Sequence, residues 1–269
     1  MPEGHTLHRL ARAHQRRYGG RPVRISSPQG RFAAAAALLD GRVLRRAEAH
    51  GKHLFHDYGP DAKVHVHLGL YGQFQEHELP VAPPVGEVRM RMVGETHWAD
   101  LRGPAACELL TDIEVVALRA RLGPDPLRRD ADPDRAWARI SASRRPVAAL
   151  LMEQNVVAGI GNVYRAELLF RHRIPPLLPG RSLDRPLWTD MWTDLVSLMR
   201  RGVRTGRIDT VRDAHLPGAT GRPPRRDRHG GEVYVYRRAG QPCHVCGTEV
   251  ATRLLVARKL YWCPSCQAG

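Results

Sequence analysis

The sequence has no hydrophobic run long enough to cross a membrane. Its longest apolar runs are AAAAALL at 33–39 and VAALLM at 147–152, whereas a membrane-spanning helix needs about 20 such residues. The opening MPEGHTLHRL has no apolar core of the kind found in secretory signals. We therefore expect a cytoplasmic protein without a membrane partner.

Acidic residues are scarce relative to basic ones. The 269 residues include 42 Lys and Arg against 27 Asp and Glu, which gives a net charge of +15 and a pI near 10.6. Most of the excess is arginine, which suits phosphate, and counterion release would favour a polyanionic partner. A generally basic surface would give the same composition. The charge therefore indicates nucleic acid without establishing it.

The length allows two or three compact units, and the hydrophobic pattern changes near residue 115. A helical stripe begins at Thr6. Strand-like alternation follows in the segments 52–58, 63–68 and 88–93. Beyond a linker, Asp132 and Pro133 form a helix start. We expect further helices around 146–155, 162–171 and 187–205, and a mobile basic loop over 216–231.

His65 and His67 fall on one face of a predicted strand. Two imidazoles on one face permit metal binding, but no third ligand is evident nearby. We therefore favour cross-strand packing for this pair.

Cysteine is rare, and four of the five cysteines lie in two CxxC pairs separated by sixteen residues, Cys243/Cys246 and Cys263/Cys266. This spacing is typical of a four-cysteine zinc ribbon, in which each pair supplies two thiolates to one tetrahedral Zn²⁺. Two disulfides or a redox pair are the alternatives. Structural disulfides are uncommon inside cells, and a redox CxxC does not require a second one. Cys107 is expected to be an inert thiol in a strand.

A glycine-flanked turn at 158–162 precedes the predicted helix 162–171. Such a turn leaves backbone N–H groups free at the positive end of the helix, where phosphate binds well. Asn162 is placed to bind a phosphate or to cap the helix, and ordinary capping alone would explain the pattern.

The start of the chain has a simple structural interpretation. Pro2 suits a first helical turn, and Glu3 suits its positive end. Four motifs in order change that interpretation: the PEG start, GKHLF at 51–55, AGIGNVYRAELLF at 158–170 and RKLYWCPSCQ at 258–267. Together they resemble the formamidopyrimidine-DNA glycosylase and endonuclease VIII family, closest to its actinobacterial endonuclease VIII-like branch, over essentially the whole chain.

The resemblance implies an α+β multidomain fold in three parts. These are an N-terminal β-sandwich with an N-terminal helix (2–115), a helix–two-turn–helix domain (131–225) after a linker (116–130), and a zinc finger (233–269). It also implies a monomeric, nucleoid-associated enzyme of base-excision repair that needs one structural Zn²⁺ and no catalytic metal or organic cofactor.

The resemblance assigns chemistry to Pro2. Removal of Met1 would give Pro2 a free secondary amine, which attacks C1′ of a damaged nucleotide and forms an iminium. Glu3 would act as acid and base. Lys52 would bind phosphate and assist β-elimination, and Arg258 would grip the phosphates beside the lesion and act in δ-elimination.

The DNA contacts implied by the family begin with Asn162 and Arg121, which match phosphate-binding positions. Leu70 and Tyr71 match the loop that fills the space left by an extruded base. The preceding residue is Gly69, where the family's better-known pattern has a polar side chain.

Oxidised pyrimidines are the expected substrates, because Ala148 stands where the purine-directed branch carries a lysine. Duplex DNA is the expected partner, with single-stranded or bubble DNA as a further substrate. Two alternatives remain at this point: a purine-directed formamidopyrimidine or 8-oxoguanine glycosylase, and a non-catalytic zinc-ribbon DNA-binding protein.

Overall fold

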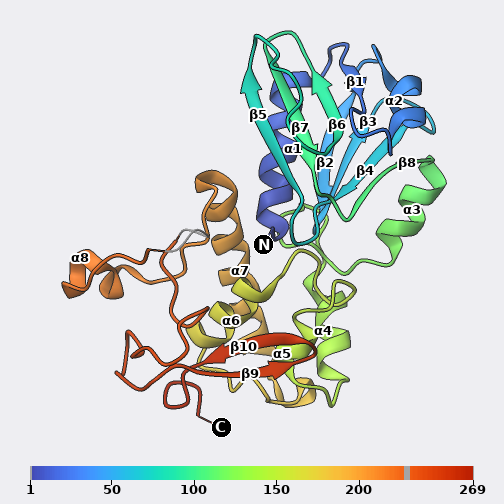
Figure 1. The fold of residues 1–269 in the computed structure, drawn as a ribbon. Helices are drawn as coiled ribbons and strands as arrows, with labels where there is room; N and C mark the ends of the chain where they lie inside the picture. The colour runs from blue at the N-terminus through green and yellow to red at the C-terminus, as the bar shows by residue number, and fades with distance from the viewer. Residues whose placement is uncertain (1, 227–230, 269) are drawn as a thin grey trace. The chain divides into compact units, whose positions relative to one another are not determined.

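The structure is a computed structural model that describes residues 2–226 and 231–268, and it divides into two compact units, 1–121 and 122–269 (Figure 1). No helix among these residues is long and apolar enough to span a bilayer. The expected boundaries of three domains stay a prediction.

The first unit is a β-sandwich. One antiparallel sheet has the order β1 (Arg24–Ser26), β6 (Val88–Val93), β7 (His97–Arg102) and β5 (Gln73–Glu78). The other has the order β2 (Arg46–His50), β3 (His53–Asp57), β4 (Lys63–His67) and β8 (Ala106–Leu110). Alternate side chains of both sheets meet in one core, which includes Met90, Leu101, Leu54 and Val66. The predicted sandwich is confirmed.

Three helices complete this unit. Helix α1 (Gly4–Tyr18) packs on β2 and β3, α2 (Ala33–Leu39) packs on β1, and α3 (Asp112–Ala120) follows β8. The N-cap of α3 is a reciprocal capping box between Thr111 and Glu114. Arg119 of α3 lies over the ring of Phe55, so the middle of β3 is buried on both faces and not on one as the alternation predicts.

The second unit contains the remaining helices and a β-hairpin. The helical elements are α4 (Pro133–Ser141), α5 (Val147–Leu150), α6 (Asn162–Arg171), η1 (Gly180–Ser182), α7 (Arg185–Thr205), η2 (Asp213–His215) and α8 (Pro217–Thr220). Strands β9 (Ala251–Leu255) and β10 (Arg258–Trp262) pair near the C-terminus. The Asp132 cap is confirmed, because its side chain accepts from the N–H of Asp134. The helix expected over 146–155 is only the four residues of α5.

In this unit, the helices and the C-terminal residues 233–263 share one hydrophobic core. Glu167 of α6 is fully buried and accepts hydrogen bonds from the backbone N–H groups of Tyr234, Val235 and Tyr236. A buried carboxylate is tolerated only when donors surround it. Glu167 therefore ties the segment that leads to the hairpin onto the central helix.

The expected mobile loop over 216–231 is partly described. Its first residues form α8, and Arg222 pairs with Glu232 at 2.6 Å. Residues 227–230 lie outside the described residues.

Candidate active site

Pro2 and Glu3 precede the first helix. Helix α1 begins at Gly4, and Glu3 is its N-cap residue with an extended backbone, φ −119° and ψ 178°. The interpretation of Pro2 as a first helical residue is therefore wrong. Glu3 is fully buried, and its carboxylate makes no capping hydrogen bond. The buried carboxyl of Glu3 therefore lies directly beside Pro2 and does not serve as the hydrogen-bonding cap of α1.

His5 adds a neutral base to the same turn. Burial first, and then the positive charges of the chain N-terminus, Arg9 and His8, lower the pKa of His5 to about 4. The imidazole is therefore neutral near pH 7 and provides both a donor and an acceptor beside the first residues.

Lys52 lies at a hairpin tip between β2 and β3. His50 and His53 are paired across the hairpin, so only Gly51 and Lys52 form the turn. Gly51 has φ +57°, a conformation that favours glycine. The tight turn fixes where the Lys52 backbone lies, and its side chain is half-buried.

A hydrogen-bonded chain of side chains runs from β8 to the strand that follows Lys52. His65 Nδ1 lies 2.8 Å from a carboxylate oxygen of Glu108, and His65 Nε2 lies 2.8 Å from His53 Nδ1. Burial lowers the pKa of His53 to about 3 and, against the effect of Glu108, lowers that of His65. Because the carboxylate can only accept, His65 donates through Nδ1 and His53 in turn donates to His65. The free Nε2 of His53 is then an acceptor.

The expected cross-strand packing of the histidines is confirmed. The rings of His53 and His65 stack with centroids 5.0 Å apart, and His67 lies 5.1 Å from His53. Among the residues that the structure describes, the four paired cysteines are the only group of at least three side chains that could hold a metal ion.

Leu70 and Tyr71 lie in the exposed loop between β4 and β5, with 48% and 85% of their surfaces accessible. Gly69 precedes them with φ +68°, and a Cβ on this residue would lie 2.8 Å from Cβ of Ala105. Close approach of the Ala105 segment therefore excludes the polar side chain that the family pattern has at this place.

Arg121 caps the C-terminal end of α3 and is exposed. A cation is favourable at that end of a helix, so its place has a local structural reason besides any DNA contact.

Asn162 joins α6 to the hairpin. It is the first residue of α6, and Gly161 is the N-cap, so Asn162 does not cap the helix. Its Nδ2 donates to the carbonyl of Lys259 at 2.9 Å, and Arg165 donates both to Asn162 Oδ1 and to that same carbonyl. Asn162 itself is buried, so these bonds fix its amide between α6 and the hairpin.

Arg258 begins β10 directly after the tip of the hairpin. Val256 and Ala257 form that tip with φ +48° and +57°, as in a tight turn with two left-handed residues. Arg258 is exposed, and its neighbour Lys259 provides the carbonyl that binds Asn162. The hairpin tip is therefore attached to the N-terminal end of α6.

The four paired cysteines meet as the spacing predicts. Their sulfur atoms all lie within 4.8 Å of one another, with Cys246 and Cys263 3.4 Å apart. Four thiols at such distances fit a tetrahedral Zn²⁺. Cys107 lies apart in β8, where burial raises the pKa of its thiol to about 12.

Comparison with known proteins decides the family. Models of the formamidopyrimidine-DNA glycosylase N-terminal domain, its H2TH domain, and the zinc finger found in FPG and IleRS match residues 1–107, 122–213 and 240–269. The chain belongs to this family. The predicted four-cysteine zinc site, which holds one structural Zn²⁺, is thereby confirmed.

Relatives of this family member include "Endonuclease 8 1" of Mycobacterium tuberculosis, 59% identical over 99% of this chain and 100% of the relative. The "DNA-(apurinic or apyrimidinic site) lyase Nei2" of Mycolicibacterium smegmatis is 36% identical over the full length of both chains. The predicted enzyme class, a DNA glycosylase with AP lyase activity, and the endonuclease VIII-like branch are confirmed.

The fold of this glycosylase is also that of a solved enzyme. Formamidopyrimidine-DNA glycosylase of Lactococcus lactis, bound to DNA with an AP site, superposes with a TM-score of 0.79 at 20% identity, covering 99% and 100% of the two chains. At this identity the likeness concerns the fold alone.

Each unit holds its own set of predicted site residues. Residues 1–121 contain Pro2, Glu3, Lys52, Leu70, Tyr71 and Arg121, and residues 122–269 contain Asn162, Arg258 and the four zinc cysteines. The sequence reasoning missed Arg165 and the chain from Glu108 to His53. The alternation of 63–68 was a signal for the latter, but only the register of β3, β4 and β8 shows which side chains meet.

Proposed function

We propose that this glycosylase removes oxidised bases through Pro2 and then cleaves the abasic strand by β,δ-elimination. The observation that carries the proposal is Glu3, a fully buried carboxyl that follows Pro2 directly and does not cap α1. A buried carboxyl next to the proposed nucleophile is placed as a catalytic acid or base would be.

The first step is nucleophilic. Once Met1 is removed, the nitrogen of Pro2 is a secondary amine that attacks C1′, the glycosidic bond breaks, and the base leaves with its electron pair. The Pro2 nitrogen loses its proton, Glu3 protonates the sugar-ring oxygen as the bond from that oxygen to C1′ breaks, and the product is an iminium. A secondary amine gives an iminium without an N–H proton, so its positive charge persists and draws electrons from C2′.

The second step is elimination. Lys52 at the β2–β3 turn assists removal of the C2′ proton, after which the 3′ phosphate leaves. Arg258 at the hairpin tip stabilises the phosphates that flank the lesion and supports the δ step. Asn162 and Arg121 bind backbone phosphates, and Leu70 and Tyr71 occupy the space of the extruded base.

Oxidised pyrimidines are the proposed substrates. The relatives at 59% identity are named Endonuclease 8 1, and Ala148, at the position of the purine branch's lysine, is fully buried without a charge. Purine lesions are the second candidate, because a relative at 31% identity is a formamidopyrimidine-DNA glycosylase.

We further propose that the enzyme acts as a monomer on nucleoid DNA in the cytoplasm, and on single-stranded or bubble DNA as well as duplex.

Borohydride trapping tests the mechanism. The zinc-loaded protein is mixed with oligonucleotides that carry an abasic site, thymine glycol or 8-oxoguanine. Reduction of the iminium should give a covalent adduct, more with thymine glycol than with 8-oxoguanine. Protein that keeps a peptide before Pro2 is the matched control, because its nitrogen is an amide and should not trap. Equal trapping by the blocked and free proteins would exclude Pro2 as the nucleophile, and absence of any adduct would mean that the reaction does not pass through an iminium.

A further inference from the structure

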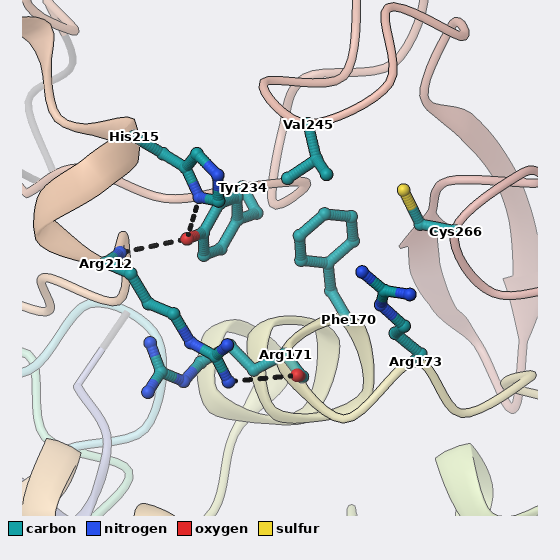
Figure 2. A pocket seen from close by; sticks show the side chains of 8 residues that line it. All are labelled: Phe170, Arg171, Arg173, Arg212, His215, Tyr234, Val245 and Cys266. Carbon is teal, nitrogen blue, oxygen red and sulfur yellow. Dashed lines mark hydrogen bonds between the residues drawn. The ribbon is translucent and has the colours of Figure 1, made fainter. Parts of the chain in front are cut away.

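A pocket lies at the C-terminal end of α6 (Figure 2). Its other walls come from the segment that holds Arg212 and Tyr234 and from the two CxxC turns of the zinc site. Asn162 stands at the other end of this helix, about 13 Å away at 1.5 Å per residue. The pocket is therefore separate from the phosphate-binding positions proposed above.

The size of the pocket suits one small group. The cavity volume is about 50 Å³, and one water molecule needs about 10–15 Å³ of cavity volume. The space holds a few waters, or one tetrahedral oxyanion in their place.

The lining carries the positive charge of arginines and no Asp or Glu side chain, and its one cysteine, Cys266, belongs to the zinc site. Three arginines line it: Arg171, Arg173 and Arg212. Arg171 is already paired, because it donates to both carboxylate oxygens of Asp194 at 2.6 and 2.7 Å. Arg212 makes one long side-chain contact, 3.4 Å to the carbonyl of Arg171, which leaves most of its donors for a ligand.

Arg173 occupies an unusual backbone conformation. Its φ is +54°, just beyond the end of α6, where glycine is the usual residue. A side chain held in this conformation costs about 1 kcal/mol or more, and Figure 2 shows it beside Phe170 in the pocket. Strain of this kind collects at functional positions.

His215 contributes a further hydrogen-bonding group. The backbone N–H of Arg212 donates to the hydroxyl oxygen of Tyr234 at 2.9 Å, and that hydroxyl lies 2.9 Å from His215 Nδ1. In the tautomer in which this hydroxyl donates its proton to Nδ1, the ring hydrogen of His215 is on Nε2, where it can be donated to a ligand.

We propose that this pocket binds the phosphate group of a phosphomonoester. Arg173 and Arg212 provide charge-assisted hydrogen bonds and His215 a third donor, a set that matches the several oxygens of a phosphate. Phe170 and the exposed Val245 flank the site and offer an apolar surface to the organic part of the ligand. A ligand bound there would connect the two CxxC turns of the zinc site to the C-terminal end of α6.

The test follows the side-chain signals of Arg173 and His215 by NMR in the zinc-loaded protein, without DNA. Inorganic phosphate, thymidine 5′-monophosphate and a 5′-phosphorylated oligonucleotide are the three probes, with chloride at equal ionic strength. Both signals should shift with phosphate and with the nucleotide, and tighter binding of the oligonucleotide would identify a DNA end as the source of the phosphate.

Arg173→Gly is the deciding variant, because glycine suits its backbone conformation and preserves the fold. It should weaken phosphate binding about tenfold, the value of roughly one such contact, while cleavage of abasic DNA stays unchanged. Arg139→Gln removes an equally exposed positive charge from α4 and should leave phosphate binding intact. Equal affinity in both variants, or signals that do not move at millimolar phosphate, would overturn the proposal whatever the outcome of borohydride trapping.

Discussion

At the scale of single residues, the position of Glu3 predicts a role in base excision. Its carboxyl is buried at the start of α1 without serving as a cap. We expect Glu3→Gln to reduce excision of an intact damaged base by at least about a hundredfold, the usual contribution of a general acid. Strand cleavage at a preformed abasic site should fall less, because no glycosidic bond remains to be broken. Single-turnover rates on both substrates give the comparison.

The control for this variant is Glu95→Gln, an exposed glutamate paired with Arg21 in the same unit. It should match the native protein on both substrates. If Glu3→Gln slowed the two reactions equally, a role in base expulsion would be ruled out.

Arg121 carries a prediction about affinity. If it contacts a phosphate, Arg121→Ala should weaken binding to many sequences alike and flatten the dependence of log affinity on log salt by about one unit. Asn162→Ala should weaken binding without a similar change of slope, because no charge is lost. Titration of duplex DNA at several salt concentrations measures both. An unchanged slope for Arg121→Ala would mean that the residue only caps α3.

At the scale of elements, the loop between β4 and β5 depends on Gly69. Gly69→Ala introduces a left-handed alanine and places its Cβ 2.8 Å from that of Ala105. Gly86→Ala is the matched control, since it has the same φ of +68° with nothing within 4 Å. Strain alone costs about 1 kcal/mol, so Gly86→Ala should lose about that much and Gly69→Ala clearly more. Urea unfolding of both variants gives the two values, and equal losses would contradict a steric role for Ala105.

A second prediction at this scale is that the hairpin of β9 and β10 depends on the bound zinc for its folding. One Zn²⁺ per chain is expected by metal analysis, lost in Cys263→Ala and kept in Cys107→Ala, because only Cys263 belongs to the four-sulfur cluster. Since β9 and β10 form a two-stranded sheet by themselves, removal of the metal should unfold the hairpin and weaken DNA binding. A zinc-free protein with full affinity for DNA would contradict this.

At the scale of the whole molecule, buried histidines make the free energy of unfolding depend on pH. His14 and His56 are fully buried and share a 2.9 Å hydrogen bond between α1 and β3. Burial lowers the pKa of His14 to about 3 and that of His56 well below its usual value. The unfolded chain binds protons near pH 6.5 and the folded chain does not, so stability is complete above that pH and falls as the pH drops toward 3.

The size of this effect follows from linkage. Each such histidine should cost about 2 kcal/mol of stability at pH 5 compared with neutral pH. Urea unfolding between pH 7 and pH 5 measures the loss. The variant His56→Gln keeps a polar partner for His14 but does not titrate, so its pH dependence should be shallower. A native protein equally stable at both pH values would show that these imidazoles are protonated in the fold.

Much of the molecule could be predicted from local patterns. Strands β3, β4 and β6 of the sandwich, the Asp132 cap, α6 and the zinc ligands all follow from rules that act over a few residues, such as alternation, capping and CxxC spacing. Family motifs identified the enzyme class because its chemistry needs particular residues in a particular order. These features depend on neighbours in the chain, so the sequence alone determines them.

Tertiary structure decided what depends on residues far apart in the chain. Glu108, His65 and His53 meet only through strand register, and the amide of Asn162 is joined to a carbonyl 97 residues away. The helix expected over 146–155 was shortened to α5, where Val147 and Ala148 donate their backbone N–H groups to Leu178 and Pro176. The pocket at Arg173 likewise exists only because Phe170, Tyr234 and Val245 pack together. Such contacts form when distant segments share a core and satisfy each other's polar groups, and no local pattern encodes which segments those are.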